Sequence, residues 1–307
     1  MPPEPQLSVV ICTHNPRTDY LGRCLAALEA QTLPRDQWEL LVIDNVCDEP
    51  LAPRVDLAWH PGARIVREDT LGLTPARLRG IQEATAPLLV FVDDDNVLAT
   101  DYLEVALRVA ADKPFLGSWS GGCEPEFDTP PPPWLRRYWG NLALREVDRD
   151  MWSNQPRQAE TLPCGAGLCV RAVVAQHYLM LNLTGQRSFQ LDRTGASLIS
   201  GGDQDLAACA CDLGYGVGVI AALHLTHLIP AGRLTLDYQA RLAEGIYFSA
   251  VILAALRGSE PELNGYRVRW THTVRALLAR GPHRRIQLAS LTGRRRGLAY
   301  VQQMPRA

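Results

Sequence analysis

Three consecutive carboxylates, Asp93, Asp94 and Asp95, directly follow the apolar run LLVFV. Such a run is typical of a buried strand, so the three acids would project from one fixed point. Adjacent carboxylates repel one another unless a cation or protons neutralise them, and Mg²⁺ or Mn²⁺ commonly bridges carboxylates to phosphate groups. The cluster therefore predicts a metal–phosphate site. The alternative is a solvated acidic turn that stabilises the start of the next helix.

Polar side chains also end two earlier apolar segments. LSVVICT ends at Thr13, which is followed by His14 and Asn15, and ELLVID ends at Asp44. In open α/β sheets, ligands bind at the carboxyl ends of the parallel strands. We therefore expect these four side chains to lie near the three aspartates.

The elements that must position these groups alternate along the first hundred residues. Apolar runs and helical spacing predict strands at 7–13, 39–44, 64–67 and 88–92, and helices at 18–31, 74–84 and 100–112. This alternation predicts an α/β half with a mainly parallel sheet. Residues 117–160, which include four consecutive Pro, are predicted to be loop-dominated and to lead into a second, mixed half.

The second half has fewer but recognisable elements. Residues 162–170 form a Gly-bearing turn into a strand, residues 199–214 a turn and helix, and residues 233–257 a long helix. From about residue 280 the chain is rich in Arg, and it has few apolar residues after Leu291. We expect this tail to fray or to bind an acidic partner.

Composition excludes several classes of protein. The chain has 307 residues, 47% of them apolar and 21% charged, which excludes general disorder and fibrous repeats. Its net charge of −2 argues against a nucleic-acid partner. The eight Cys are expected to be reduced core thiols, since only Cys209 and Cys211 are closely spaced. The N-terminus lacks the features of a signal peptide and no spanning helix is predicted, so a cytoplasmic location is expected.

Seven motifs resemble, in order, the signatures of family 2 glycosyltransferases with the GT-A fold. They are SVVICTHN, LLVIDN, LGLTPARLRGI, LLVFVDDDN, CGAGLCVR, SGGDQDL and LHLTHLIP. The likeness covers about residues 7–245 and implies a Rossmann-like, mostly parallel sheet flanked by helices. It places a GT-A catalytic domain at 1–230, with a nucleotide-binding half at about 1–98 and an acceptor half at 99–230. A C-terminal helical extension with an Arg-rich tail follows at 231–307.

The resemblance also implies roles for individual residues. The nucleotide-binding positions that it implies are Thr13, His14, Asn15, Asp44, Arg77, Asp93 and Asp94. Asp95 and His227 would bind the metal, and Asp203 would be the catalytic base. Asp205 is a rival base, but residues two apart on a helix point about 200° apart, so we prefer Asp203. Asp203 has an alternative role as the N-cap of its helix.

The implied function is a metal-dependent, inverting transfer of a sugar. The donor would be a UDP- or GDP-type nucleotide sugar, the cofactor Mn²⁺ or Mg²⁺, and the acceptor a hydroxyl of a saccharide or lipid-linked molecule, as in polysaccharide biosynthesis. One alternative is a non-catalytic nucleotide-sugar binding protein, because Leu78 and Gly202 replace the family's usual Asn and Glu. Another is a haloacid-dehalogenase-like phosphatase, although its Asp-x-Asp motif normally follows the first strand.

Two further segments leave their partners open. Residues 242–256 are apolar around most of the helix and precede Arg-rich sequence. They would either make a peripheral contact with anionic lipid at the inner face of a membrane, or pack on the catalytic core or on a homodimer partner; we favour packing. Trp134, Trp139 and Trp152 would either stack on sugar rings or pack a long surface loop.

Overall fold

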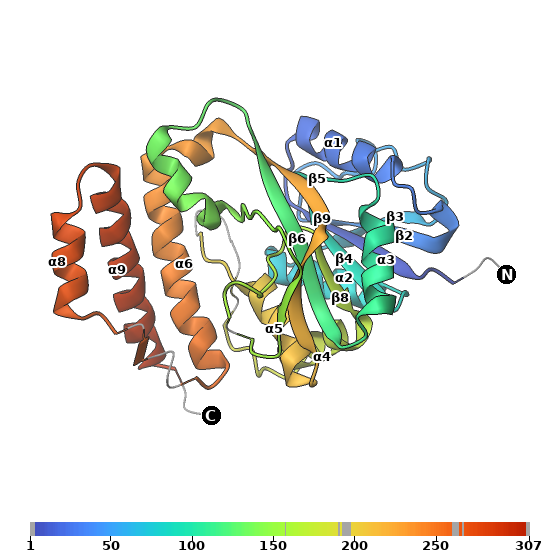
Figure 1. The fold of residues 1–307 in the computed structure, drawn as a ribbon. Helices are drawn as coiled ribbons and strands as arrows, with labels where there is room; N and C mark the ends of the chain where they lie inside the picture. Colours follow the sequence, from blue (N-terminus) through green and yellow to red (C-terminus); the bar gives the residue numbers. More distant parts are fainter. Residues whose placement is uncertain are drawn as a thin grey trace. The chain divides into compact units, whose positions relative to one another are not determined.

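The computed structural model describes residues 4–156, 158–189, 191, 198–259, 264–265 and 267–304. It has a nine-stranded sheet with flanking helices (Figure 1). The chain divides into two compact units. Unit 1 comprises Met1–Glu126, Ala143–Leu181 and Asp203–Ile229, and unit 2 comprises Phe127–Leu142, Asn182–Gly202 and Pro230–Ala307.

One half of the sheet is parallel. Its strands are β1 (Leu7–Thr13), β2 (Trp38–Asn45), β3 (Ala63–Glu68) and β4 (Leu88–Asp93), in the order β3-β2-β1-β4. The helices between and after them are α1 (Thr18–Glu29), α2 (Leu73–Glu83) and α3 (Tyr102–Asp112). Thr13 pairs in register with Asp44, and Cys12 with Asp93, so the polar strand ends meet at one edge. The predicted α/β half is therefore confirmed, with element ends that differ by no more than two residues.

The other half of the sheet is mixed. Beyond β4 the order continues with β8 (Leu168–Arg171), β6 (Leu116–Phe127), β9 (Gly216–Ile229) and β5 (Asn96–Leu98), and β7 (Met151–Ser153) pairs with β9. β8 is antiparallel to β4, and β5 is antiparallel to β9. The helices α4 (Ala172–Leu183) and α5 (Gly202–Asp212) complete this part.

The prediction that residues 117–160 are loop-dominated is wrong at its start. Residues 116–127 form the twelve-residue strand β6. The pair Gly121-Gly122 suggests a turn, but a Cβ at Gly121 would collide with the backbone of Leu223 in β9. Glycine here permits the close approach of two strands, which local sequence alone does not reveal.

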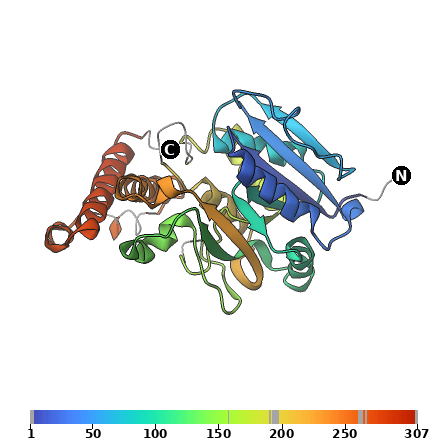
Figure 2. The same ribbon diagram turned by 90° about the horizontal axis from the view of Figure 1, so that it is seen from above.

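Unit 2 contains the C-terminal helices. They are α6 (Leu236–Leu256), α8 (Trp270–Leu278) and α9 (Pro282–Val301), with the 3₁₀ helices η2 (Pro133–Leu142) and η3 (Ala231–Leu234). In two views at right angles, α9 lies alongside α6 (Figures 1 and 2). One boundary between the units falls between Ile229 and Pro230, and the earlier segments 127–142 and 182–202 belong to the same unit as the C-terminal helices.

The expectation that the Arg-rich tail frays is wrong, because residues 282–301 form a continuous helix. Gly293 and Gly297 lie one turn apart and face α6. A Cβ at Gly293 would collide with the backbone of Glu244, and one at Gly297 would lie 2.8 Å from Cβ of Val251. These glycines let the two helix backbones approach closely. Van der Waals contacts between the backbones can then hold α9 on α6 although α9 has few apolar side chains.

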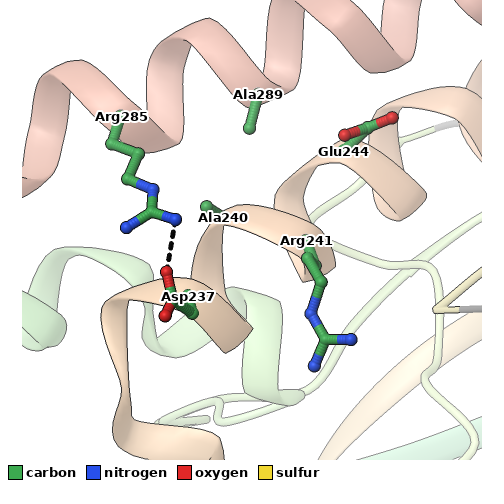
Figure 3. Close-up of a pocket in the computed structure, with 6 residues that line it drawn as sticks. All are labelled: Asp237, Ala240, Arg241, Glu244, Arg285 and Ala289. Carbon is green, nitrogen blue, oxygen red and sulfur yellow. Dashed lines mark ion pairs between the residues drawn. The ribbon is translucent and has the colours of Figure 1, made fainter. Parts of the chain in front are cut away.

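α6 is, among the described helices, the one long and apolar enough to cross a membrane by length and composition. Half of the relevant segment is buried within the protein, where α6 packs on α9. A pocket of about 510 Å³ lies on these two helices (Figure 3), lined by Asp237, Ala240, Arg241, Glu244, Arg285 and Ala289. Arg285 forms an ion pair with Asp237 there.

Candidate functional site

Asp95 and His227 come together because of strand register. Asn96 in β5 pairs with His227 in β9, and the backbone N–H of Leu228 donates to the carbonyl oxygen of Asp95 at 2.8 Å. The Nε2 atom of His227 consequently lies 3.3 Å from Oδ2 of Asp95, and both residues are 7% exposed. His224, three residues earlier in β9, is exposed, as the alternation of a strand predicts.

Asp93 lies in the same electrostatic environment. Burial and the neighbouring charge of Asp95 raise the pKa of Asp93, and Asp203 acts in the same direction, whereas Arg77 and His227 oppose the rise. Residues from β4, α2, α5 and β9 are therefore within electrostatic reach of one another. The carboxylates in this group outnumber the positive charges near them, and the group also contains one imidazole. Such a set of ligand atoms suits a divalent cation. The donor set would thus suit the Mn²⁺ or Mg²⁺ that the sequence resemblance implies.

Asp203 is held by the glycine turn before β8. The backbone N–H of Gly165 donates to Oδ2 of Asp203 at 2.7 Å. A Cβ at Gly165 would lie 3.1 Å from that oxygen and 3.2 Å from Nη2 of Arg77, so the turn, the acid and the guanidinium are in contact range. α5 begins at Gly202, so Asp203 is the second residue of the helix and does not take the alternative N-cap position. Asp205 is 2% exposed.

The glycine turn is itself fixed by α3. The hydroxyl of Tyr102 donates to the carbonyl oxygen of Gly167 at 2.7 Å, and both groups are buried. Gly167 has φ of +65°, a left-handed conformation that disfavours any side chain at this position. This contact joins the glycine turn to the helix that follows the acid cluster.

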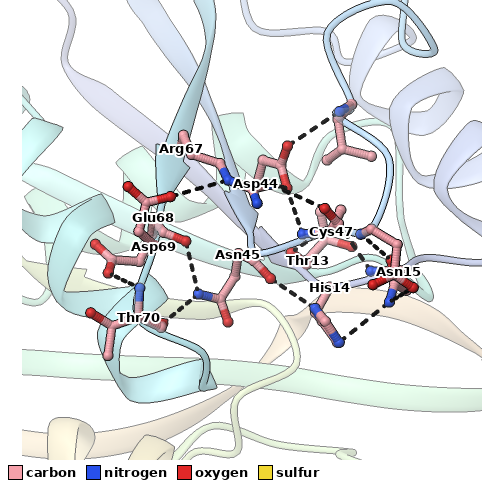
Figure 4. A network of polar contacts seen from close by, with 12 residues as sticks. Thr13, His14, Asn15, Asp44, Asn45, Cys47, Arg67, Glu68, Asp69 and Thr70 are labelled. Carbon is pink, nitrogen blue, oxygen red and sulfur yellow. Dashed lines mark hydrogen bonds and ion pairs between the residues drawn. The ribbon is translucent and has the colours of Figure 1, made fainter.

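The ends of β1 and β2 carry a polar network (Figure 4). Thr13 donates a hydrogen bond through Oγ1 to Asp94, which links β1 to the acid cluster. Nδ1 of His14 lies 2.8 Å from the carbonyl oxygen of Asn45. Asn15 is left-handed with φ of +48°, and its Oδ1 accepts from the backbone N–H of Asp48 at 2.9 Å. His14 and Asn15 remain exposed.

Asp44 is buried and hydrogen-bonded within the protein. Its carboxylate accepts from the backbone N–H groups of Cys47 at 3.1 Å and Leu51 at 3.2 Å and from Nη1 of Arg67 at 2.8 Å. Burial opposes ionisation, but these hydrogen bonds, with one from the Cys47 thiol, and the Arg67 charge hold the pKa of Asp44 below its ordinary value. Asp44 is 3% exposed, so its main contacts order the loop 46–51. A contact with a nucleotide stays a prediction.

Sequence reasoning gave no role to two residues at this edge. Arg67, the residue before the last one of β3, pairs with Asp44 and has 41% of its side chain exposed, so it offers a cation beside the predicted nucleotide site. Asn45 donates to the carbonyl oxygen of Thr70 at 2.7 Å and accepts from the backbone N–H of Gly72 at 2.8 Å, which fixes the entry to α2 and hence Arg77. The available signals were that Arg67 ends the predicted strand 64–67 and that Asn45 directly follows the predicted strand 39–44.

The Trp-rich stretch does not form one surface loop. Trp134 and Trp139 lie on η2 in unit 2, where Trp139 packs against Phe127, while Trp152 lies on β7 in unit 1 and packs against Phe115. A shared stacking face for a sugar is thus not built from these three residues within either unit.

None of the eight Cys forms a disulfide in the structure, and five of them are buried. The close pair Cys209 and Cys211 does not supply a zinc site on its own. Cys209 instead lies near His177 and Asp212, with one ligand atom of each within 4.8 Å of the others. Cys209 packs in the hydrophobic core, and His177 lies 3.8 Å from Asp212. We assign this group to packing between α4 and α5.

Comparison with solved structures defines the class of fold. The chain superposes on the crystal structure of TarS 1–349 from S. aureus with a TM-score of 0.52 at 14% identity, covering 97% of this chain and 92% of that one. It superposes on the mannosyltransferase PcManGT from Pyrobaculum calidifontis, solved with GDP-Man and Mn²⁺, with a TM-score of 0.53 at 18% identity, covering 99% and 77%. These matches show a GT-A type α/β fold.

Sequence comparison points in the same direction. Residues 8–159 match the model for glycosyl transferase family 2. EpsH of Bacillus subtilis is 28% identical over 111 residues, covering 36% of this chain and 31% of EpsH. The glycosyltransferase AglE of Haloferax volcanii is 29% identical over 103 residues, covering 33% and 34%. Each match thus spans about a third of the relative's own length.

Proposed function

We propose that the chain is a metal-dependent, inverting glycosyltransferase. It would move a sugar from a nucleoside-diphosphate sugar to a hydroxyl of a saccharide or lipid-linked acceptor. The observation that carries this proposal is the convergence of Asp93, Asp95, Asp203, His227 and Arg77, from distant parts of the sequence, at the carboxyl end of β4. The GDP-Man and Mn²⁺ in the complex of PcManGT support this class of donor and cofactor.

Asp95 and His227 are the residues that would hold Mn²⁺ or Mg²⁺. When bound, such an ion would neutralise charge that develops on the diphosphate leaving group. Arg77 supplies a permanent positive charge from α2, and Asn45 fixes the entry to that helix. Thr13 orients Asp94 through its hydroxyl.

Asp203 is the residue that we propose as the general base. The N–H of Gly165 holds Oδ2, so Oδ1 is the oxygen that would accept the proton of the acceptor hydroxyl as it attacks the anomeric carbon. A positioned base contributes about 10²–10⁴ in rate. His14, Asn15 and Arg67 are the exposed polar groups at the strand ends, and they are candidates for recognising the nucleoside.

The experiment compares Asp203→Asn with Asp212→Asn, a control at the far end of the same helix. Asp203→Asn should lower turnover about 10²–10⁴-fold because the base is lost, while nucleotide affinity measured by calorimetry stays within about twofold. Asp212→Asn should preserve turnover. Near-normal turnover by Asp203→Asn would remove Asp203 from the mechanism.

Metal and donor use need a separate measurement. Thermal shifts with a panel of UDP- and GDP-sugars, each with and without Mn²⁺, identify the donor. Asp95→Ala should abolish the metal-dependent part of the shift. If no nucleotide sugar stabilises the wild-type protein with or without the ion, the proposed donor site is wrong.

A non-catalytic nucleotide-sugar binding protein is the second candidate. Gly202 stands where the family has Glu, and Leu78, in place of the family's Asn, packs against the hydrophobic core rather than offering a polar contact. This candidate predicts binding of a nucleotide sugar without hydrolysis or transfer. Release of nucleoside diphosphate during incubation with the bound donor distinguishes the two.

A further inference from the structure

The helix α8 exposes the apolar side of its sequence. Trp270, Val274, Leu277 and Leu278 are 77%, 40%, 48% and 74% exposed. Their spacing places all four on one side of the helix, which we call the apolar face of α8. Ala276, on the opposite side, is 1% exposed.

The packing of α8 is therefore the reverse of that of an ordinary surface helix. Such a helix turns its apolar stripe to the core and its polar side to water. α8 instead packs on α9 through small and polar groups, including Thr273, whose Oγ1 accepts from Arg295 at 3.4 Å. A contiguous exposed group of large apolar side chains marks a surface that another molecule covers.

The charge around this face identifies its occupant. Residues 263–307 contain ten Arg and no Asp or Glu, a charge of +10 in a chain whose net charge is −2. Two arginines of α9 are neutralised within unit 2, since Arg285 pairs with Asp237 and Arg296 with Glu244. The arginines nearest α8 in sequence are Arg267, Arg269, Arg275 and Arg280. All four are exposed, and they make no ion pair with any residue in the described ranges.

We propose that the apolar face of α8 and these flanking arginines dock the protein on a bilayer that contains anionic lipid. Trp and Leu side chains enter the boundary between headgroups and acyl chains, while Arg side chains bind lipid phosphates. A second copy of this chain is a poorer occupant, because two such faces would bring like charges together. The surface is distinct from residues 242–256 of α6, which pack on α9.

The experiment is flotation of the full chain with lipid vesicles. Wild-type protein should float with vesicles of phosphatidylcholine and phosphatidylglycerol, should not float with phosphatidylcholine alone, and should be released by high salt. Leu277→Ser combined with Leu278→Ser should weaken binding by at least about tenfold, because two large apolar side chains no longer enter the bilayer. Arg275→Gln and Arg280→Gln should each weaken it by about fivefold.

The control is a matched apolar pair on another helix. Met180 and Leu183 of α4 are 53% and 62% exposed, and Met180→Ser combined with Leu183→Ser should leave flotation unchanged. Circular dichroism melting curves check that every variant folds. The change in Trp fluorescence on vesicle addition should be reduced in Trp270→Phe.

Three results would overturn the proposal. One is wild-type protein that does not float with anionic vesicles. Another is equal flotation of the Leu277/Leu278 variant and the wild type. The third is a wild-type dimer in sedimentation velocity that this variant converts to a monomer, which would assign the face to self-association instead.

Discussion

The buried carboxylates of unit 1 differ in what neutralises them. Glu39 accepts from Ser8 at 2.6 Å, from the N–H and hydroxyl of Thr85 at 2.7 and 2.8 Å, and from Arg64 at 2.7 Å. Burial opposes its ionisation, but these hydrogen bonds hold the pKa of Glu39 below its ordinary value. The pKa of Asp93 is raised instead. The charge of Glu39 is thus stabilised by hydrogen bonds within the protein, whereas the cluster around Asp93 is suited to binding a cation from solution.

Glu39→Gln should make the free energy of unfolding less dependent on pH in the acid range. A folded-state pKa below 4.5 means that ionised Glu39 stabilises the protein above that pH, and that this contribution is lost as pH falls through the folded pKa. Urea unfolding at neutral pH should show that the free energy of unfolding falls by about 1–3 kcal/mol, because the amide N–H₂ of Gln would face the donor groups that now bind the carboxylate. The difference from wild type should shrink below pH 4.5.

The control for this change is Glu49→Gln. The side chain of Glu49 is 79% exposed, and its ion pair with Arg54 is long, at 3.6 Å. It should change the free energy of unfolding by no more than about 0.5 kcal/mol. A loss at Glu39 that stays constant from neutral to acid pH would contradict the assigned role of its charge.

Gly165→Ala should disturb the proposed base and the neighbouring arginine together. The added methyl would press on Asp203 and Arg77 at 3.1 and 3.2 Å, so both side chains would have to move. We expect kcat to fall by about tenfold to a hundredfold, and donor affinity to fall as well because Arg77 is displaced. The control is Gly22→Ala in α1, where a Cβ meets nothing within 4 Å. Equal kcat for both variants would count against the orienting contact.

At the scale of elements, close backbone approach recurs in both units. Gly121 brings β6 against β9 in unit 1, and Gly293 and Gly297 bring α9 against α6 in unit 2. Glycine weakens an isolated strand or helix, so its presence in these interiors is understandable only from the neighbour that it admits. These contacts determine how tightly the strands and helices can pack.

Gly293→Ala combined with Gly297→Ala tests this packing. Helix propensity alone predicts a gain of about 1 kcal/mol for each change. Overpacking costs about 1–3 kcal/mol at each site, and one neighbour is a backbone that cannot move away easily, so a net loss should result. The measurement is the midpoint of thermal unfolding, compared with Gly232→Ala, where a Cβ has open space. A higher midpoint would show that the helices are not in close contact.

At the scale of the whole molecule, unit 2 is discontinuous in sequence. Its segments 127–142 and 182–202 precede the helices with which they interact. The hydroxyl of Tyr138 lies 2.9 Å from Nδ1 of His283, and Ser249 accepts from the backbone N–H of Ser200 at 3.0 Å. The C-terminal helices are therefore part of the support for earlier segments rather than a removable appendage.

Truncation after Ile229 tests this dependence. The shortened chain should expose apolar side chains of the two orphaned segments, including Leu135 and Leu191, which are 0% and 3% exposed in the full chain. We expect aggregation and increased binding of a hydrophobic dye. Supplying residues 230–307 as a separate chain should reduce both, and a monomeric, dye-free truncated protein would show that unit 2 is dispensable.

The sequence predicted those elements correctly whose structure follows from a local pattern of apolar and polar residues. The apolar runs of β1, β2 and β4 are buried strands whatever surrounds them, and the acids after β4 follow from the same pattern. β6 and α9 were missed because their glycines depend on partners distant in sequence. The hydrogen bond from Gly165 to Asp203, and the exposed Arg67 beside Asp44, likewise depend on spatial neighbours that no local pattern specifies.

The discontinuity of unit 2 also has a consequence for synthesis on the ribosome. The 3₁₀ helix at Pro133–Leu142 emerges about 160 residues before α9 is complete, a delay of roughly 8–30 s at ordinary elongation rates. Leu135 and its neighbours must remain uncovered during that interval. Nascent chains stalled between residues 142 and 230 should therefore be the forms of this protein that most need chaperones.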